Sequence, residues 1–455
     1  MYKNQYMTEA AEQGMLFKKR KQEMTAAERV GMLQGKLYCK AKQESGYRFY
    51  VLYDKMFVKY LLQEGYNRVK ANGGSPGIDG QNFKDIENYG QEKFLHELGE
   101  DLRKRSYKPQ AVKRVWIDKA NGGRRPLGIP TIRDRVAQQV CKMIIEPIFE
   151  ADFEDSSYGF RPKRSSKDAM KAIKTHLQEG KTEVLDADLS SYFDTIPHDK
   201  LMKVLQLRIT DPRILHLIEL WLKSPIYEDG QFKGGKKQKV GIPQGGVISP
   251  LLANIYMHLV DKLVNNMNKL FHKMGIKIVR YADDFVLLGN KITEESLEKL
   301  RNILARMRLT LNEQKTRIVQ AKDESFNFLG FTICYDRDIH GRNAHYWNIK
   351  PSDKSVNKIK EKLREFLNHS GHFNPTQVAK GLNTILRGWL NYMDIPKLSY
   401  PAMSKRKIRY YLVETLYRYY NRKSQRRSRL YGTQAFELLV SKYGLIDPTK
   451  YHVRN

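Results

Sequence analysis

The pattern of hydrophobic and polar positions divides the chain into a first part of mixed helices and strands and a last part of helices alone. Up to about residue 349, segments with apolar residues at helical spacing are interleaved with shorter apolar or alternating stretches. Beyond that point the helical spacing continues and no strand pattern returns. This order predicts an α+β body followed by a helical module, with a boundary near Lys350.

Individual elements follow from the same pattern. Helices are predicted at residues 1–45, 47–66, two stretches between 81 and 106, 133–149, 165–178, 199–223, 249–270 and 294–308. Strands are predicted at 112–117, 124–129, 183–189, 239–244 and 326–334, with two more around a tight turn within 277–288. Gly and Pro punctuate residues 72–80, which predicts a loop there.

Charge and composition indicate the kind of partner. The 455 residues carry a formal net charge of +31 and include 27 tyrosines. Such an excess of cations indicates a large polyanion, either nucleic acid or an anionic membrane, and the tyrosines favour nucleic acid because aromatic rings stack on bases. No apolar run approaches the ~20 residues of a membrane span, so we expect no membrane partner and a cytoplasmic protein. Three dispersed cysteines, expected to be buried, show no metal-ligand spacing.

A pair of adjacent carboxylates, Asp283 and Asp284, lies at the predicted turn between two apolar strands. Like charges so close repel each other unless a cation neutralises them, and Mg²⁺ binds carboxylate together with phosphate oxygens. An acidic turn without any function has the same composition. The pair alone therefore leaves both interpretations open.

A third carboxylate, Asp188, ends the apolar strand that starts at Glu183. Two-metal phosphoryl transfer needs a carboxylate from a second strand to bridge ions about 3.5–4 Å apart. Asp186 lies two residues earlier on the same strand face and is a competing candidate, whereas Asp194 fits a turn cap. We prefer Asp188 because the aromatic Phe193 then lies where a sugar could pack.

The segment 241–250, GIPQGGVISP, combines paired glycines with a helix-start pattern. Glycines allow a backbone to approach a ligand closely. Ser249 and Pro250 also fit the N-cap and first position of a helix. The two interpretations are compatible.

These segments occur in an order that resembles the reverse transcriptases encoded by bacterial group II introns. The similarity covers roughly residues 50–440. The blocks that carry it are, in order, SPGIDG, RRPLGIP, YGFRP, DADLSSYFDTIPH, GIPQGGVISPLLANIYM, RYADDFVLL, LTLNEQKT and FNFLGF. A later block at 386–392, LRGWLNY, resembles the signature of the family's thumb, or maturase, domain.

The resemblance implies a right-hand polymerase with antiparallel palm sheet and RNA-directed DNA polymerase activity. Its expected parts are an N-terminal helical extension (1–70), fingers and palm (71–345) and a helical thumb or maturase domain (346–455). Asp188, Asp283 and Asp284 match the family's catalytic carboxylates, which hold two Mg²⁺ ions for which Mn²⁺ could substitute. A Cys- and His-containing nuclease domain, which many members carry after the thumb, is not expected.

Six further residues match positions that bind the incoming dNTP in the family: Lys119, Arg125, Phe193, Gln244, Gly245 and Lys315. The first two would hold the triphosphate across the predicted hairpin, which suits two cations facing phosphates. The phenylalanine matches the aromatic that excludes a ribose 2′-hydroxyl, and the Gln-Gly pair matches the lining of the nascent base pair. The last lysine lies in the block near the leaving pyrophosphate, although a solvated surface lysine is an equal alternative.

The end of the helical module is rich in cations with interleaved tyrosines. The nucleic-acid-binding candidates there are Lys405, Arg406, Lys407, Arg409, Arg422, Lys423, Arg426 and Arg427. A charge run is often only a solvated face, but its thumb-like position and helical period favour contact with RNA or with a template–primer duplex.

We therefore expect a polymerase that binds its parent group II intron RNA, assists splicing and copies the RNA into DNA for retrohoming. Its partners would be intron RNA, template RNA with a DNA primer, dNTPs and target DNA, in a bacterial cytoplasm near the nucleoid. An alternative is a domesticated relative in host defence or DNA repair without an intron partner. A third hypothesis, an RNA-binding protein with an inert polymerase, is disfavoured by the intact carboxylates.

Overall fold

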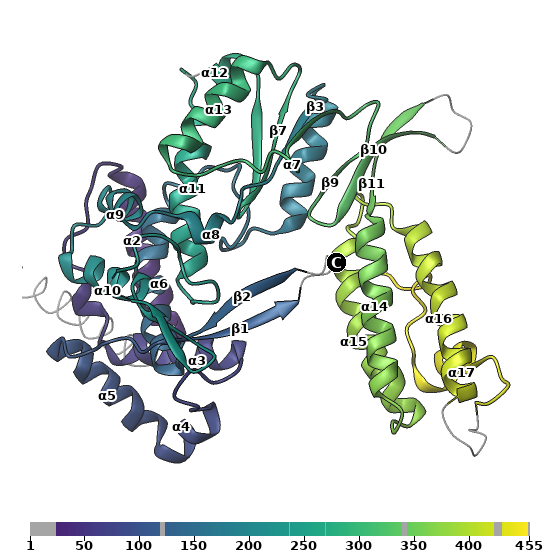
Figure 1. Cartoon of the computed structure of the whole chain (residues 1–455), viewed down its shortest axis with the longest axis horizontal. Helices are drawn as coiled ribbons and strands as arrows, with labels where there is room; N and C mark the ends of the chain where they lie inside the picture. Colours follow the sequence, from purple (N-terminus) through teal and green to yellow (C-terminus); the bar gives the residue numbers. More distant parts are fainter. Residues whose placement is uncertain are drawn as a thin grey trace, which may run out of the picture.

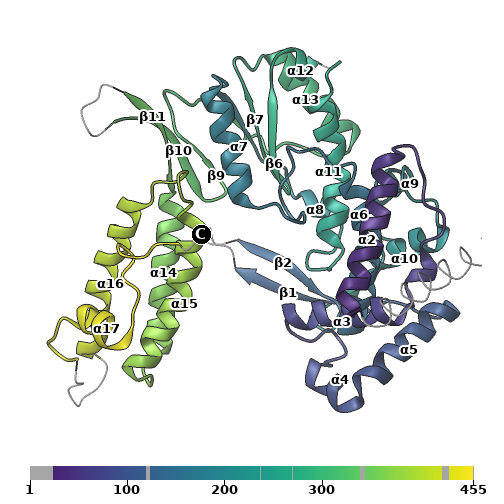
Figure 2. The same ribbon diagram turned by 180° about the vertical axis from the view of Figure 1, so that it is seen from behind.

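A body of mixed helices and strands precedes a purely helical part. The structure is a computed structural model that describes residues 24–118, 123–235, 237–268, 270–338, 344–422 and 430–453. Within these residues all strands end by Pro351, and only helices follow (Figure 1). The hairpin of β1 (Val112–Asp118) and β2 (Arg124–Ile129) projects from the N-terminal helices toward α14 (Asp353–His369) and α15 (Pro375–Met393) in both views (Figures 1 and 2).

Helices of the body start at residues suited to capping. Thr25 caps α2 (Ala26–Gln43) through a capping box with Glu28, and Thr131 caps α6 (Ile132–Glu150). The other described helices of the body are η1 (Tyr53–Lys55), α3 (Lys59–Asn72), α4 (Phe83–Tyr89), α5 (Gln91–Lys104), α7 (Ser166–Gln178), α8 (Tyr192–Thr195), α9 (His198–Gln206), α10 (Pro212–Leu222), α11 (Ser249–Asn265), α12 (Leu270–Lys273) and α13 (Glu294–Arg306).

The described strands form three sheets with the orders β2-β1-β4-β5, β6-β7-β3-β8 and β11-β10-β9. Apart from the parallel pair of β1 and β4, neighbouring strands run antiparallel. The remaining strands are β3 (Glu183–Ala187), β4 (Pro225–Glu228), β5 (Gln231–Gly234), β6 (Lys277–Tyr281), β7 (Asp284–Gly289), β8 (Arg317–Gln320), β9 (Phe326–Phe328), β10 (Phe331–Arg337) and β11 (His345–Pro351).

The sheet β6-β7-β3-β8 is buried on both faces, because alternate residues of its strands enter different cores. Leu185 and Phe285 belong to the core that includes α6 and α11. Val184 and Val286 belong to the core that includes α7 and the sheet of β9, β10 and β11. A one-residue slip of any central strand would exchange the two sets, so burial on both faces fixes the register.

The N-terminal helices share the larger of these cores. Val30 and Leu37 of α2 pack with Leu61 of α3 and with Val136 and Val140 of α6. Residues on both sides of position 70 are therefore parts of one hydrophobic core.

The helical part has its own core, built from apolar positions three and four residues apart. Leu382, Leu386 and Leu390 form the buried face of α15 and meet Leu363 of α14. The other two helices of this part are α16 (Ala402–Arg422) and α17 (Ala435–Tyr443).

Most predicted elements are confirmed, but several boundaries are wrong. The helix expected at 47–66 starts only at Lys59, and the one expected at 199–223 is two helices, because Pro212 with Asp211 as N-cap starts a new one. The helix expected at 249–270 ends at Asn265. The strand expected at 326–334 is two strands, because Leu329 and Gly330 adopt positive φ angles in a turn.

Four of the described strands were not predicted: β4, β5, β8 and β11. The segment expected to be extended at 239–244 makes only an isolated bridge, at Val240. Cys141 is buried as expected, whereas Cys39 is exposed. Among the described helices, none is long and apolar enough to cross a membrane.

Candidate active site

Two predicted carboxylates meet at the end of the central sheet. The β3–β7 pairing ends with Ala187 opposite Phe285, and one further step of this register sets Asp188 opposite Asp284. Both lie at the ends of buried central strands, so the fold holds two carboxylates side by side at one end of the sheet.

The third carboxylate, Asp283, lies in the two-residue turn between β6 and β7. Its neighbour Ala282 has a φ of +61°, a left-handed conformation that is unfavourable for a residue with a Cβ atom. Gly159 approaches this turn so closely that a Cβ there would lie 2.4 Å from the Ala282 nitrogen. Surrounding contacts therefore hold a strained turn that carries one of the candidate catalytic groups.

Arg280, which is completely buried, lies beneath this turn. Its guanidinium donates to the Ala282 carbonyl (2.7 Å) and to the Asn254 side-chain oxygen (2.9 Å). It also donates to both oxygens of the buried Asp261 carboxylate, at 2.8 Å from Nε and 2.6 Å from Nη2. This network, which was not predicted from the sequence, fixes the backbone next to Asp283.

Asp188 is paired with a cation in the structure. Lys315 Nζ donates to Asp188 Oδ2 at 2.9 Å, and the Asn312 amide donates to the same oxygen at 3.3 Å. The predicted dNTP-binding residue Lys315 therefore lies at the acidic cluster itself, with its side chain 64% exposed.

The other carboxylates make no such direct ion pair within the described residues. Burial raises the pKa of Asp283, an effect that Arg125 opposes and Asp188 increases. Asp284 is exposed to solvent at its surface. Partial loss of hydration at its carboxyl, together with the negative charges of Asp283 and Asp188, still raises its pKa to about 6. Burial also raises the pKa of Asp186. Neighbouring carboxylates whose pKa values are raised in this way are typical of cation-binding sites.

A cavity of about 670 Å³ opens beside the cluster, and Asp186, Asp188, Asp284 and Lys315 line it. Asp186 thus reaches the same space as Asp188 and stays a competing candidate. Among the described residues, no three acidic, histidine or cysteine side chains form a ready metal-binding group. A metal ion held here would need oxygen ligands from a substrate as well, as Mg²⁺ commonly does.

Three of the predicted dNTP-binding residues come together beside β2. Arg125 Nε donates to the Gln244 side-chain oxygen at 2.8 Å, and the Gln244 amide reaches Asp194 at 3.5 Å. At Gly245, which has a φ of +106°, a Cβ would lie 2.2 Å from the Gly128 carbonyl oxygen, so only glycine fits this approach.

Phe193 precedes Asp194 and is 9% exposed, packed edge-to-face on Tyr192. Its carbonyl accepts from the Ile242 amide at 2.7 Å, which joins it to the GIPQGG segment. The remaining predicted triphosphate ligand, Lys119, lies outside the described residues.

The basic candidates of the helical part separate into two groups. Lys405 is buried and donates to Asp394 at 2.6 Å, and Arg409 lies 3.3 Å from Asp447. These two cations make ion pairs within the fold, which favours a structural role, and their expected role as nucleic-acid ligands stays a prediction.

Exposed residues of α16 form a second group, which we call the basic stripe: Arg406, Lys407, Tyr410, Tyr417 and Arg418. Arg422 is also exposed at the end of α16. The candidates Lys423, Arg426 and Arg427 lie outside the described residues.

Comparison with known families matches two parts of the chain. Residues 117–333 match the family described as "Reverse transcriptase (RNA-dependent DNA polymerase)". Residues 356–432 match the family described as "Group II intron, maturase-specific domain". The first match contains all three candidate catalytic carboxylates, and the second contains the basic stripe.

Individual relatives agree with these matches. The protein YkfC of Escherichia coli is 37% identical over 317 residues, which cover 62% of this chain and 82% of YkfC. The group II intron-encoded protein LtrA of Lactococcus lactis is 31% identical over 331 residues, 70% of this chain and 53% of LtrA.

An uncharacterized 91 kDa protein in the cob intron of Schizosaccharomyces pombe is 27% identical over 428 residues, 77% of this chain and 52% of that protein. This chain thus spans about half the length of LtrA and of the yeast protein. Both family matches fall on one chain in the order polymerase, then maturase domain. The chain therefore belongs to the family of group II intron-encoded reverse transcriptases with a maturase domain and is an RNA-directed DNA polymerase.

Proposed function

We propose that Asp188, Asp283 and Asp284 are the catalytic carboxylates of this polymerase and bind two Mg²⁺ ions. The observation that carries the proposal is the strand register that sets Asp188 opposite Asp284, next to the turn that holds Asp283. Reverse transcriptases use divalent metal ions, and carboxylates from two strands are the arrangement that two-metal nucleotidyl transfer requires.

The residues present fit such ions. Burial and mutual repulsion raise the pKa of Asp283 and of Asp284, so a nearby cation would be stabilised there. The Lys315 ammonium on Asp188 supplies positive charge at the same place. When bound, Mg²⁺, or Mn²⁺ in its place, would supply the positive charge that activates the primer 3′-hydroxyl and neutralises the leaving pyrophosphate.

Nearby side chains have the chemistry to hold an incoming dNTP. Arg125 is exposed, lies next to Gln244 and carries a charge suited to a triphosphate, a role that we propose Lys119 shares. The close backbone contact at Gly245 positions the segment proposed to line the nascent base pair. Phe193 presents a packed ring beside this segment, which supports discrimination against a ribose 2′-hydroxyl.

The helical part would bind RNA. The basic stripe on α16 combines cations with tyrosines that are 69% and 52% exposed, at Tyr410 and Tyr417. Cations attract phosphates and exposed rings stack on unpaired bases, so this surface suits RNA. We propose the division into N-terminal extension (1–70), fingers and palm (71–345) and thumb or maturase domain (346–455).

The RNA partner proposed is the parent group II intron, since LtrA and other relatives bear names of intron-encoded proteins. The chain would assist its splicing and copy it into DNA at a DNA target. Sequencing of RNA that co-purifies with the full chain tests this partner. Enrichment of one group II intron supports the proposal, and a mixture without any intron would contradict it.

Substitutions by asparagine test the carboxylates, with extension of oligo(dT) on poly(rA) as the measurement. Asp188→Asn, Asp283→Asn and Asp284→Asn should each lower the rate by a factor on the order of 10³ or more. The matched control Asp186→Asn, from the same cavity, should keep activity within about tenfold. If instead Asp186→Asn were inactive and Asp188→Asn active, the assignment would move to Asp186. RNA binding by all four variants should be unchanged.

A further inference from the structure

A second cavity, of about 450 Å³, lies on the opposite face of β10 from the acidic cavity. Thr332 lines the acidic cavity and Tyr335 lines the second one. Residues three apart in a strand point to opposite faces, so β10 separates the two spaces. The residues that line the second cavity include Lys174, Lys322, Tyr335, His345, Trp347 and Tyr400.

Aromatic rings follow one another along this face of the β10–β11 hairpin. His345 stacks on Tyr335 with ring centres 5.2 Å apart and planes within 17°, and Tyr335 lies 4.7 Å from Trp347. Trp347 is buried, whereas His345 is exposed, so the row runs from the core to the surface. Tyr400 adds a fourth ring that is 47% exposed, with Lys174 Nζ 5.9 Å from its centre.

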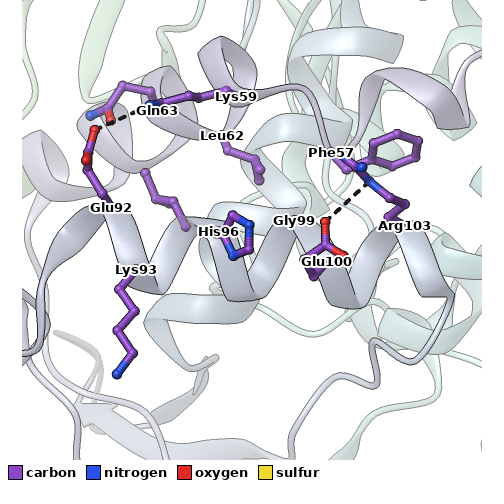
Figure 3. A pocket seen from close by; sticks show the side chains of 11 residues that line it. Phe57, Lys59, Leu62, Gln63, Glu92, Lys93, His96, Gly99, Glu100 and Arg103 are labelled. Carbon is purple, nitrogen blue, oxygen red and sulfur yellow. Dashed lines mark hydrogen bonds and ion pairs between the residues drawn. The ribbon is translucent and has the colours of Figure 1, made fainter.

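The two lysines of this cavity are not neutralised by acidic neighbours. Across the described residues, no carboxylate lies within ion-pair distance of Lys174 or Lys322. In a third cavity, of about 600 Å³ between α3 and α5, cations are instead paired with carboxylates (Figure 3). There Lys59 lies 3.4 Å from Glu92, and Arg103 lies 3.5 Å from Glu100. The positive charge at the β10 cavity is therefore not neutralised by a described carboxylate and suits an anionic ligand.

We infer that the cavity at β10 binds one unpaired nucleotide of a single-stranded RNA. Its rings supply stacking surfaces for a base, and Lys174 and Lys322 supply charge for the adjoining phosphate. A volume of about 450 Å³ suits one nucleotide. The inference deepens the proposed RNA-binding function and rests on it: it adds a site for RNA outside the acidic cavity, with residues that do not belong to the basic stripe.

Photocrosslinking of a defined RNA tests this site. A ten-nucleotide oligouridylate that contains 4-thiouridine is bound to the full chain and irradiated, and the attached peptides are identified by mass spectrometry. We expect attachment to peptides that contain Tyr335, His345 or Tyr400. Annealing the RNA to a complementary strand should abolish this attachment, because paired bases are not free to stack on protein rings.

Two variants and a matched control make the result specific. Tyr400→Ala and Lys322→Gln change exposed side chains and should each lower attachment at these peptides by about fivefold or more. The control Tyr89→Ala changes a ring that is 45% exposed with Lys93 Nζ 4.4 Å above it, and should have no effect. All three variants should extend oligo(dT) on poly(rA) at the unaltered rate.

The outcomes separate this inference from the proposed function. The inference would be overturned if the RNA attached only to other peptides, or if Tyr400→Ala and Lys322→Gln left the attachment unchanged. Normal primer extension would in that case still support the assignment as a polymerase. In that event the cavity would suit a different partner, such as a protein segment. An unaltered chain that binds no RNA anywhere would instead contradict the proposed function.

Discussion

Arg280 and Asp261 form an ion pair in which neither side chain is accessible to solvent. The arginine comes from the strand that leads into the Ala282–Asp283 turn, and the aspartate comes from α11. One guanidinium nitrogen of the same arginine donates to the Ala282 carbonyl. The ion pair therefore connects the core of the body to the backbone of the candidate active site.

Substitution of Arg280 should lower both stability and activity, and a second substitution at Asp261 should restore only stability. Arg280→Met leaves Asp261 buried and unpaired, which should lower the free energy of unfolding by about 3–5 kcal/mol. Arg280→Met combined with Asp261→Leu removes both charges and should recover most of that loss. Primer extension should stay low in both, by a factor on the order of 10², because the Ala282 carbonyl has lost its donor. Urea denaturation and steady-state extension measure the two effects.

Full recovery of extension by the double variant would contradict the positioning role of Arg280. A substitution that only weakens the core, Val136→Ala on α6, is the control. It should lower stability and leave the rate of extension at low temperature unchanged.

Lys315 should compete with metal ions for Asp188. Lys315→Met removes the ammonium 2.9 Å from Asp188 Oδ2. Without divalent metal the variant should lose stability by less than about 1 kcal/mol, because the lysine is largely exposed. Added Mg²⁺ should then raise its melting temperature more than that of the unaltered chain. Thermal melting with and without Mg²⁺ measures this, with Lys299→Met on the exposed face of α13 as control. Equal Mg²⁺ responses would contradict the competition.

Asp284 should destabilise the metal-free fold above about pH 6. Loss of hydration and repulsion from Asp283 and Asp188 raise its pKa to about 6, so between pH 6 and 4 the folded chain binds a proton that the unfolded chain does not. Stability from this group therefore increases as the pH falls. Asp284→Asn should raise metal-free stability at pH 7.5, by about 1 kcal/mol or less because the carboxyl reaches solvent, and have no effect below pH 4.

Urea denaturation in EDTA measures this difference, and the exposed Asp323→Asn serves as the control. Lower stability of Asp284→Asn at pH 7.5 would contradict the assigned electrostatics.

The parts of the site that follow local rules could be predicted from the sequence. The turn at Ala282–Asp283 follows from two apolar strands around a short polar break, and Asp188 follows from its place at a strand end. Strand periodicity cannot separate Asp186 from Asp188, because both point to the same face. The structure keeps both at one cavity for this reason.

Long-range contacts set the limit of prediction. A charged Arg280 within the apolar stretch KIVRY indicates a buried cation that needs an anionic partner. The sequence does not identify that partner, because Asp261 lies 19 residues away on a helix. The strand β11 was not predicted; its place in the sheet depends on pairing with β10, from Phe331 opposite Pro351 to Arg337 opposite His345. The row of rings that His345, Tyr335 and Trp347 form exists only once these two strands pair.

His258 should lower the stability of the fold, most strongly in acid. It is buried against Phe153 with ring centres 5.4 Å apart, and among the described residues neither of its ring nitrogens has a hydrogen-bond partner. Burial, with the nearby charges of Lys262 and Arg280, lowers its pKa to about 3. Between pH 6.5 and 3 the unfolded chain takes up a proton that the folded chain does not, so this histidine reduces stability as the pH falls.

His258→Met should therefore raise the free energy of unfolding by about 1–3 kcal/mol at pH 7.5, and by more at pH 5.5. Urea denaturation at the two pH values measures this, and the exposed His216→Met is the control. A gain that is the same at both pH values would show that titration of His258 does not contribute.

The basic stripe should determine how steeply RNA binding depends on salt. Arg406 and Lys407 are exposed at the start of α16, whereas the neighbouring Lys405 is buried in its ion pair with Asp394. Each phosphate contact adds to the slope of log binding constant against log salt, so Arg406→Gln with Lys407→Gln should reduce that slope by about 1 to 2. Titration of a fluorescein-labelled 30-nucleotide RNA at several salt concentrations measures it. Lys299→Gln, which changes another exposed cation, on α13, should leave the slope unchanged. An unchanged slope in the double variant would indicate that the RNA binds another surface. Loss of a cation that contacts a phosphate must reduce the number of counterions released on binding, and with it the slope.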